Sequence, residues 1–240
     1  MNDTNETKPP ELPKTTPEPV ITPLPAGANI IQVFENLLKS PASLIKTIEA
    51  GKDSKNLIIK LLIFVAIGFF IFGITLGSFS FGTQLWAAPL KTLIGITIAS
   101  IICLPSLYIF SALTGTSLKL PEIAQGIAAS IALMAALLLG FTPVLWVFSQ
   151  STESEAFFGT LVIITWIIAL IFGIEFLLKM LKQSGLEKNA PIYIWVGIFI
   201  LVTLQMSTTL RPIIGTSDEF FTGEKLFFLE HWLIESSSTH

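Results

Sequence analysis

Five long apolar stretches constrain this chain more than any other feature of its sequence. They cover about residues 57–78, 92–113, 123–148, 156–178 and 192–210. A helix of about 20 such residues crosses a hydrocarbon layer of about 30 Å. Every backbone polar group in a bilayer needs an internal partner, and a helix supplies one for each. The sequence therefore predicts an all-α, polytopic membrane bundle of five transmembrane helices, which occupies residues 56–212.

The composition agrees with this class and removes several others. Only 13% of the 240 residues are charged, whereas soluble domains carry about 25%. The net charge of −3 comes without a cluster of basic residues, so nucleic acid is not an expected partner. The single cysteine, Cys103, allows neither an intramolecular disulfide nor a cysteine-based zinc site.

Basic residues near the span ends predict the orientation, because they concentrate on the cytosolic side. If the N-terminus is inside, the inner segments hold nine lysines and the outer segments hold three basic residues. The inner ones are Lys39, Lys46, Lys52, Lys55, Lys60, Lys119, Lys179, Lys182 and Lys188, and the outer ones are Lys91, Arg211 and Lys225. We therefore expect the N-terminus inside and the C-terminus outside, with Lys91 reaching toward one of the head-group layers.

Three segments outside the spans complete the predicted layout. Residues 1–28 hold seven prolines and no aromatic residue, so they are expected to be a disordered cytosolic tail. Within them, Pro10 to Pro13 has the spacing of a polyproline ligand. The tail is therefore either a binding segment or a linker. Residues 29–55 read as two short amphipathic helices that meet at Ser40 and lie in the interface or on the cytosolic ends of the bundle. Residues 213–240 are rich in aromatic side chains and are expected along the outer interface, with a partner-binding helix as the alternative.

Small residues mark the expected helix contacts. Inside a bilayer, small side chains let two backbones approach closely and pack by dispersion. The third span carries a four-residue spacing of such positions, and the first span carries one pair. They are Ala124, Ala128, Ala132, Ala136 and Gly140 in the third span and Gly73 and Gly77 in the first. We expect the five positions to share one face and the third span to be the central packing helix.

No catalytic motif is present in the sequence. The two histidines, His231 and His240, lie beyond the last span, which argues against a zinc protease. There is no glycine-rich phosphate loop and no Gly-x-Ser-x-Gly elbow. We therefore expect no enzymatic activity, no cofactor and no metal site.

Three polar residues within the spans are candidates for a pathway. A carboxylate at membrane depth, such as Glu175, is a functional candidate by default. It precedes Lys179 by four residues, which also suits an ion pair on one helix face. Gln125 and Gln205 are expected either to bond neighbouring helices or to line a polar path.

The layout also resembles a known family. The segment Phe34-Glu-Asn-Leu-Leu-Lys-Ser-Pro41-Ala-Ser-Leu-Ile-Lys, the five spans, and the passage from Leu107 to Gly126 are similar to the Yip1 family, particularly its divergent bacterial members, over roughly residues 30–212. The Asp-Leu-Tyr-Gly-Pro-type signature of the eukaryotic branch is absent, and with it the basis for a role in Rab-linked trafficking. The resemblance implies a non-enzymatic polytopic protein that organises membrane or partners.

Two functional hypotheses follow. The first is a Yip1-like scaffold in the bacterial cytoplasmic membrane, which contacts the lipid bilayer and either a membrane-protein partner or a second copy of itself. The alternative is a small permease or channel subunit that uses Glu175, Gln125 and Gln205.

Overall fold

The structure, a computed structural model, describes residues 22–25, 27–51, 54–80, 82–186 and 190–209. Within these ranges the chain forms seven α-helices and no strand, as the all-α prediction requires. They are α1 (Ile30–Lys39), α2 (Pro41–Glu49), α3 (Ser54–Gly77), α4 (Gln84–Leu113), α5 (Leu120–Ser151), α6 (Glu155–Gln183) and α7 (Ala190–Thr209). The expected outer segment 213–240 and most of the expected tail lie outside the described residues.

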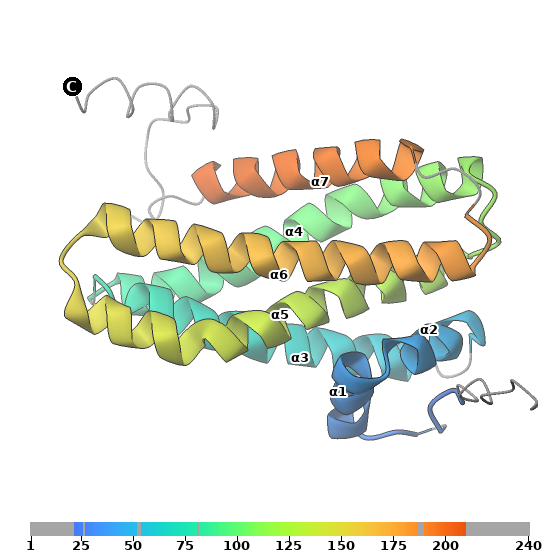
Figure 1. Cartoon of the computed structure of the whole chain (residues 1–240), viewed down its shortest axis with the longest axis horizontal. Helices are drawn as coiled ribbons and strands as arrows, with labels where there is room; N and C mark the ends of the chain where they lie inside the picture. Colours follow the sequence, from blue (N-terminus) through green and yellow to red (C-terminus); the bar gives the residue numbers. More distant parts are fainter. Residues whose placement is uncertain (1–21, 26, 52–53, 81, 187–189, 210–240) are drawn as a thin grey trace, which may run out of the picture.

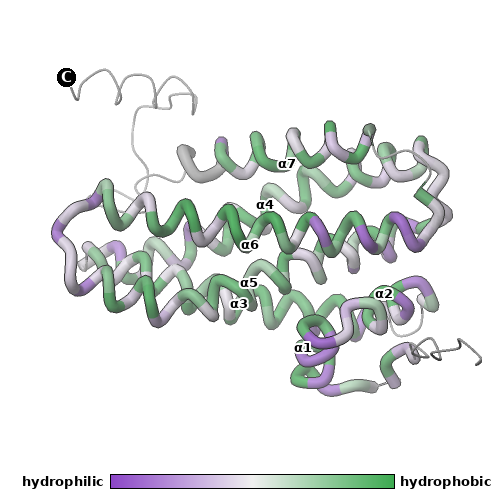
Figure 2. Tube along the Cα trace, viewed as in Figure 1, coloured by the Kyte–Doolittle hydropathy of each residue, from purple (hydrophilic) through white to green (hydrophobic). Residues whose placement is uncertain are grey.

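Four of these helices, α3 to α6, are long and apolar enough to cross a membrane. Figure 1 shows the long helices running side by side as a bundle, and Figure 2 shows that their middle portions are predominantly hydrophobic. In α7 the apolar part Ala190–Gln205 is shorter. The protein is therefore a multi-pass membrane protein by length and composition, with four helices that meet the criteria for spanning.

The helices pack in a fixed order. Helix α3 contacts α4 and α5, α5 also contacts α6, and α7 packs against α4. We call the end of the bundle that carries α1, α2 and the turns after α4 and α6 the α2 end, and the other end the opposite end (Figure 1). A backbone hydrogen bond of 3.4 Å from Ser117 to Ser184 joins the two turns at the α2 end.

The largest differences from the predicted helix boundaries are at the start of α4 and the end of α6. Helix α4 begins at Gln84, eight residues before the predicted start at 92, so that Pro89 and Lys91 lie inside it. Helix α6 continues past residue 178 to Gln183 and ends in a reverse turn at Gly185, where φ is +98°. The predicted boundaries were set where polar or proline residues interrupt the apolar run, but the helices continue through these residues.

Helices α1 and α2 form a cap on the α2 end. The break between them falls at Ser40, and Pro41 begins α2, where the missing N–H of proline costs nothing. Their buried apolar residues are Val33, Leu37, Leu44, Ile45 and Ile48. Ser184 at the end of α6 donates a hydrogen bond of 2.8 Å to Oε1 of Glu49 in α2. The pair contacts α3, α5 and α6 at this end of the bundle.

The described chain begins inside the segment that was expected to be disordered. Ala28 is buried, and the Lys60 ammonium donates a hydrogen bond of 2.6 Å to its carbonyl oxygen. Within the segment expected to be a disordered tail, Thr22 and Leu24 therefore bond to α2, and Ala28 bonds to α3.

Candidate functional site

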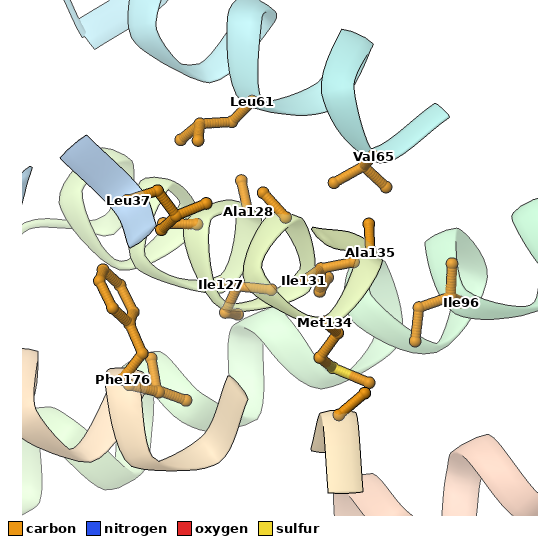
Figure 3. Packing of buried hydrophobic residues seen from close by; sticks show 14 of the residues in the cluster. Leu37, Leu61, Val65, Ile96, Ile127, Ala128, Ile131, Met134, Ala135 and Phe176 are labelled. Carbon is orange, nitrogen blue, oxygen red and sulfur yellow. The ribbon is translucent and has the colours of Figure 1, made fainter. Parts of the chain in front are cut away.

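Helices α3 and α5 pack against each other along a seam. A Cβ atom built on Gly68 of α3 would lie 2.8 Å from Cβ of Ala135, so only glycine fits there. Figure 3 shows Leu61 and Val65 of α3 facing Ala128 and Ala135 of α5. Backbones at this separation gain dispersion contacts that larger side chains would prevent. The seam is a dry contact between two of the spanning helices.

The small-residue series of α5 does not share one face. Ala128 and Ala132 are buried, Ala124 and Ala136 are half-buried, and Gly140 is exposed with open space around it. An α-helix has 3.6 residues per turn, so a four-residue step rotates about 40° and the five positions turn through about 160°. The expectation of a single face is corrected accordingly, because the series winds from the seam toward the lipid.

The predicted pair in α3 lies against α4. Cβ atoms on Gly73 and Gly77 would lie 2.8 Å from the backbone nitrogen of Pro89 and from Cα of Leu85, respectively. Both glycines therefore meet the first turns of α4, which the sequence did not place in a helix.

Two further glycines make close contacts with a methionine side chain, and the sequence analysis did not identify them. A Cβ on Gly126 of α5 would lie 2.6 Å from the sulfur of Met180 in α6. A Cβ on Gly173 of α6 would lie 2.7 Å from Cγ of Met134 in α5. Each helix thus inserts a methionine beside a glycine of the other. Such a contact cannot be predicted from a single sequence, because nothing in the sequence pairs a glycine of one helix with a methionine of another.

The three candidate pathway residues are not gathered together. Glu175 is about half exposed and forms an ion pair of 2.9 Å with Lys179. Gln125 is buried near the start of α5, about 8 Å along the helix from the α2 end, whereas Gln205 lies about 22 Å along α7 from the same end. The two glutamines are therefore near different ends of the bundle.

A cavity between α5, α6 and α7 is apolar. It is small, with a volume of about 20 Å³, and is partly open to the surroundings. It is lined by Ile127, Ser130, Ile131, Met134, Leu170, Gly173, Ile174, Leu177, Trp195 and Phe199. The single hydroxyl in this lining, that of Ser130, donates a hydrogen bond of 2.8 Å to the carbonyl of Gly126 in its own helix. The lining suits hydrocarbon rather than an ion.

Trp195 fixes α7 to α4. Its indole Nε1 donates to the carbonyl oxygen of Cys103 at 3.0 Å and lies 3.1 Å from Oγ of Ser106. Its side chain is buried and stacks on Phe199 at a centroid distance of 5.4 Å. The bond falls beside Pro105, where the backbone bonding of α4 is interrupted.

Lys91 is covered by protein. Its exposed fraction is 0%, so its side chain is enclosed by the bundle, whereas the sequence analysis placed Lys91 outside the spans. A lysine buried in a span is costly and is a functional candidate by default. The early start of α4 accounts for the difference, because it moves Lys91 two turns into the helix.

A polar cluster joins the end of α3 to α5 at the opposite end of the bundle. The hydroxyls of Ser78, after α3, and Ser149 of α5 lie 3.1 Å apart, and Nε2 of Gln150 donates to the Ser78 carbonyl at 3.3 Å. Among the residues that the structure describes, no group of three or more His, Cys, Asp or Glu side chains could hold a metal ion.

No protein-family model matches this chain, and no curated protein or solved structure matches it either. The resemblance to the Yip1 family therefore stays a prediction from the sequence.

Proposed function

We propose that this protein is a non-enzymatic integral membrane scaffold of the Yip1-like kind, resident in the bacterial cytoplasmic membrane. The observation that supports the scaffold most is the seam between α3 and α5, where Gly68 meets Ala135 and Ala132 has no exposed surface. Two helices in such contact leave no space for a water-filled path between them. A rigid anchor is what a protein that gathers partners requires.

The arrangement of polar residues supports the scaffold over a permease. Glu175 is engaged by Lys179 at an exposed position, and exposed pairs of this spacing are common helix stabilisers. Gln125 and Gln205 lie near different ends, and neither lines the apolar cavity. A transport path would need such groups to converge near mid-membrane.

In this proposal α7 is the fifth span and the N-terminus is cytosolic. Helix α7 has 20 residues, which gives a length of about 30 Å, close to the hydrocarbon thickness. In the described part of the chain, the α2 end carries Lys39, Lys46, Lys55, Lys60, Lys119, Lys179 and Lys182, and the opposite end carries Lys91. A C-terminal reporter that is active only outside the cytosol should therefore be active. Activity of a C-terminal reporter that works only in the cytosol would contradict the topology.

Cross-linking in native membranes tests the scaffold. The full-length protein, purified after cross-linking, should carry a defined membrane-protein partner or a second copy of itself. Recovery of the monomer alone across several cross-linker lengths would contradict the proposal.

A flux measurement separates the two hypotheses. In proteoliposomes the wild-type protein and Glu175→Gln should both give the proton leak of protein-free vesicles. A flux that the wild type supports and Glu175→Gln abolishes would favour the permease instead.

A further inference from the structure

An extended piece of the N-terminal segment lies along α2. The Ser43 hydroxyl donates a hydrogen bond of 2.6 Å to the carbonyl oxygen of Thr22, and the Leu24 amide donates one of 2.8 Å to Oγ1 of Thr47. Leu24 is half-buried against the apolar core. One helix therefore engages two backbone groups of this segment, while the Leu24 side chain packs against the apolar core.

The spacing of the two partners matches. Ser43 and Thr47 are four residues apart on a helix, a rise of about 6 Å. Thr22 and Leu24 are two residues apart in an extended segment between prolines, and polyproline II geometry gives about 6.2 Å for two residues. The distance between the Ser43 and Thr47 positions along the helix therefore matches the distance between Thr22 and Leu24 along the extended segment.

The prolines define what this face recognises. Pro23 and Pro25 have no N–H and favour the extended conformation, so Leu24 presents its amide between two residues that cannot donate. Ser43 supplies a donor to the carbonyl two residues before the leucine, and Thr47 supplies an acceptor for the leucine amide. Any segment of the form x-Pro-Leu-Pro offers the same groups.

We propose that the α2 face carrying Ser43 and Thr47 is a docking site for an extended x-Pro-Leu-Pro peptide. Thr22 to Pro25 is its resident ligand, and a partner protein with the same motif displaces it. The displacement by a partner rests on the proposed scaffold function, whereas occupancy by the resident segment does not.

Hydrogen exchange of the Leu24 amide in the full-length protein tests the site. In Thr47→Val the amide loses its acceptor, and its exchange should be about five- to tenfold faster, the value of one hydrogen bond. Thr160→Val is the matched control, because Thr160 and Thr47 both donate to the carbonyl four residues earlier but only Thr47 accepts from Leu24. Equal Leu24 exchange in Thr47→Val and the wild type would overturn the site.

A labelled peptide of residues 20–28 tests displacement by fluorescence anisotropy. The resident segment competes at an effective concentration on the order of mM, so the full-length Leu24→Ala variant should bind the peptide about tenfold more tightly than the wild type. Adding Thr47→Val should abolish that gain. Equal binding by all three proteins, or none by Leu24→Ala, would overturn exchangeable docking while leaving the cross-linking test of the scaffold unaffected.

Discussion

Helices α3 and α7 are held in the bundle in opposite ways. Helix α3 uses glycines, so that its backbone touches α5 at Gly68 and α4 at Gly73. Helix α7 uses a large aromatic residue, Trp195, which bonds to the backbone of α4. In hydrocarbon, burying an apolar side chain against a helix gains little over burying it in lipid, so close packing and hydrogen bonds carry association. The comparison teaches that one bundle uses both kinds of contact. Close backbone packing holds α3 at several points along its length, and the hydrogen bonds of Trp195 hold α7 at one point.

The substitution Gly73→Leu should disrupt the close packing that holds α3 in the bundle. A side chain there meets the backbone of Pro89 and Oγ1 of Thr92, and the helix backbone cannot yield as a flexible side chain would. We expect a loss of about 3 kcal/mol in the free energy of unfolding, measured by denaturant titration in mixed micelles. Gly140→Leu is the control, because a side chain at Gly140 meets open space and should leave stability unchanged. Equal losses for both would mean that α3 does not touch α4 at this point.

A smaller loss is expected from Ala132→Leu in the α3–α5 seam region. Ala132 has no exposed surface, and overpacking at such a site costs about 1 to 3 kcal/mol. The same titration should show little change for Ala112→Leu, since Ala112 is exposed on α4. Unaltered stability of Ala132→Leu would place this residue against lipid.

The α7 side should respond to Trp195→Phe with a loss of about 1 kcal/mol. Phenylalanine keeps most of the aromatic surface and removes the N–H that donates to Cys103 and Ser106, so the loss reports mainly on this donor. Trp146→Phe serves as the control because Trp146 is 55% exposed. If the two variants were equally stable, the aromatic surface alone would hold α7.

The smallest effect is expected at an ion pair in α1, which is part of neither α3 nor α7. In α1 a hydrogen bond from Lys39, 2.7 Å long, together with its charge lowers the pKa of the Glu35 carboxyl. The contribution of this pair is present above the ordinary carboxyl pKa and is lost as the pH falls through the lowered one. Lys39→Gln should return the Glu35 pKa to its ordinary value in an NMR titration. An unchanged pKa would show that Lys39 does not engage the carboxylate.

The sequence predicts the helices well because apolar length is a local property. The runs around α3, α5 and α6 are recognisable without knowledge of any neighbour, and Pro41 predicts where α1 gives way to α2. At Pro89 and Lys91 the same reasoning ends the helix too early. A lysine in an apolar run looks like a boundary, whereas the folded bundle encloses it.

The contacts between helices were predicted less well, because they depend on rotation and on partners far away in sequence. The series from Ala124 to Gly140 has the right residues, but its four-residue step turns it off the seam. The seam uses Ala128 of this series together with Gly68 and Ala135, which the series does not contain. The hydrogen bonds of Thr22 and Leu24 to α2 were equally invisible, since a proline-rich segment has the composition of a disordered tail.

The bond between Glu49 and Ser184 has a consequence for the order in which the protein is made. Its two residues are 135 positions apart, so α2 leaves the ribosome long before the end of α6 exists. The cap also contacts α3 and α5, which are made earlier, so those contacts can form first. The bond to Ser184 is the contact that waits for the last turn of α6 and then joins the two ends of the spanning region.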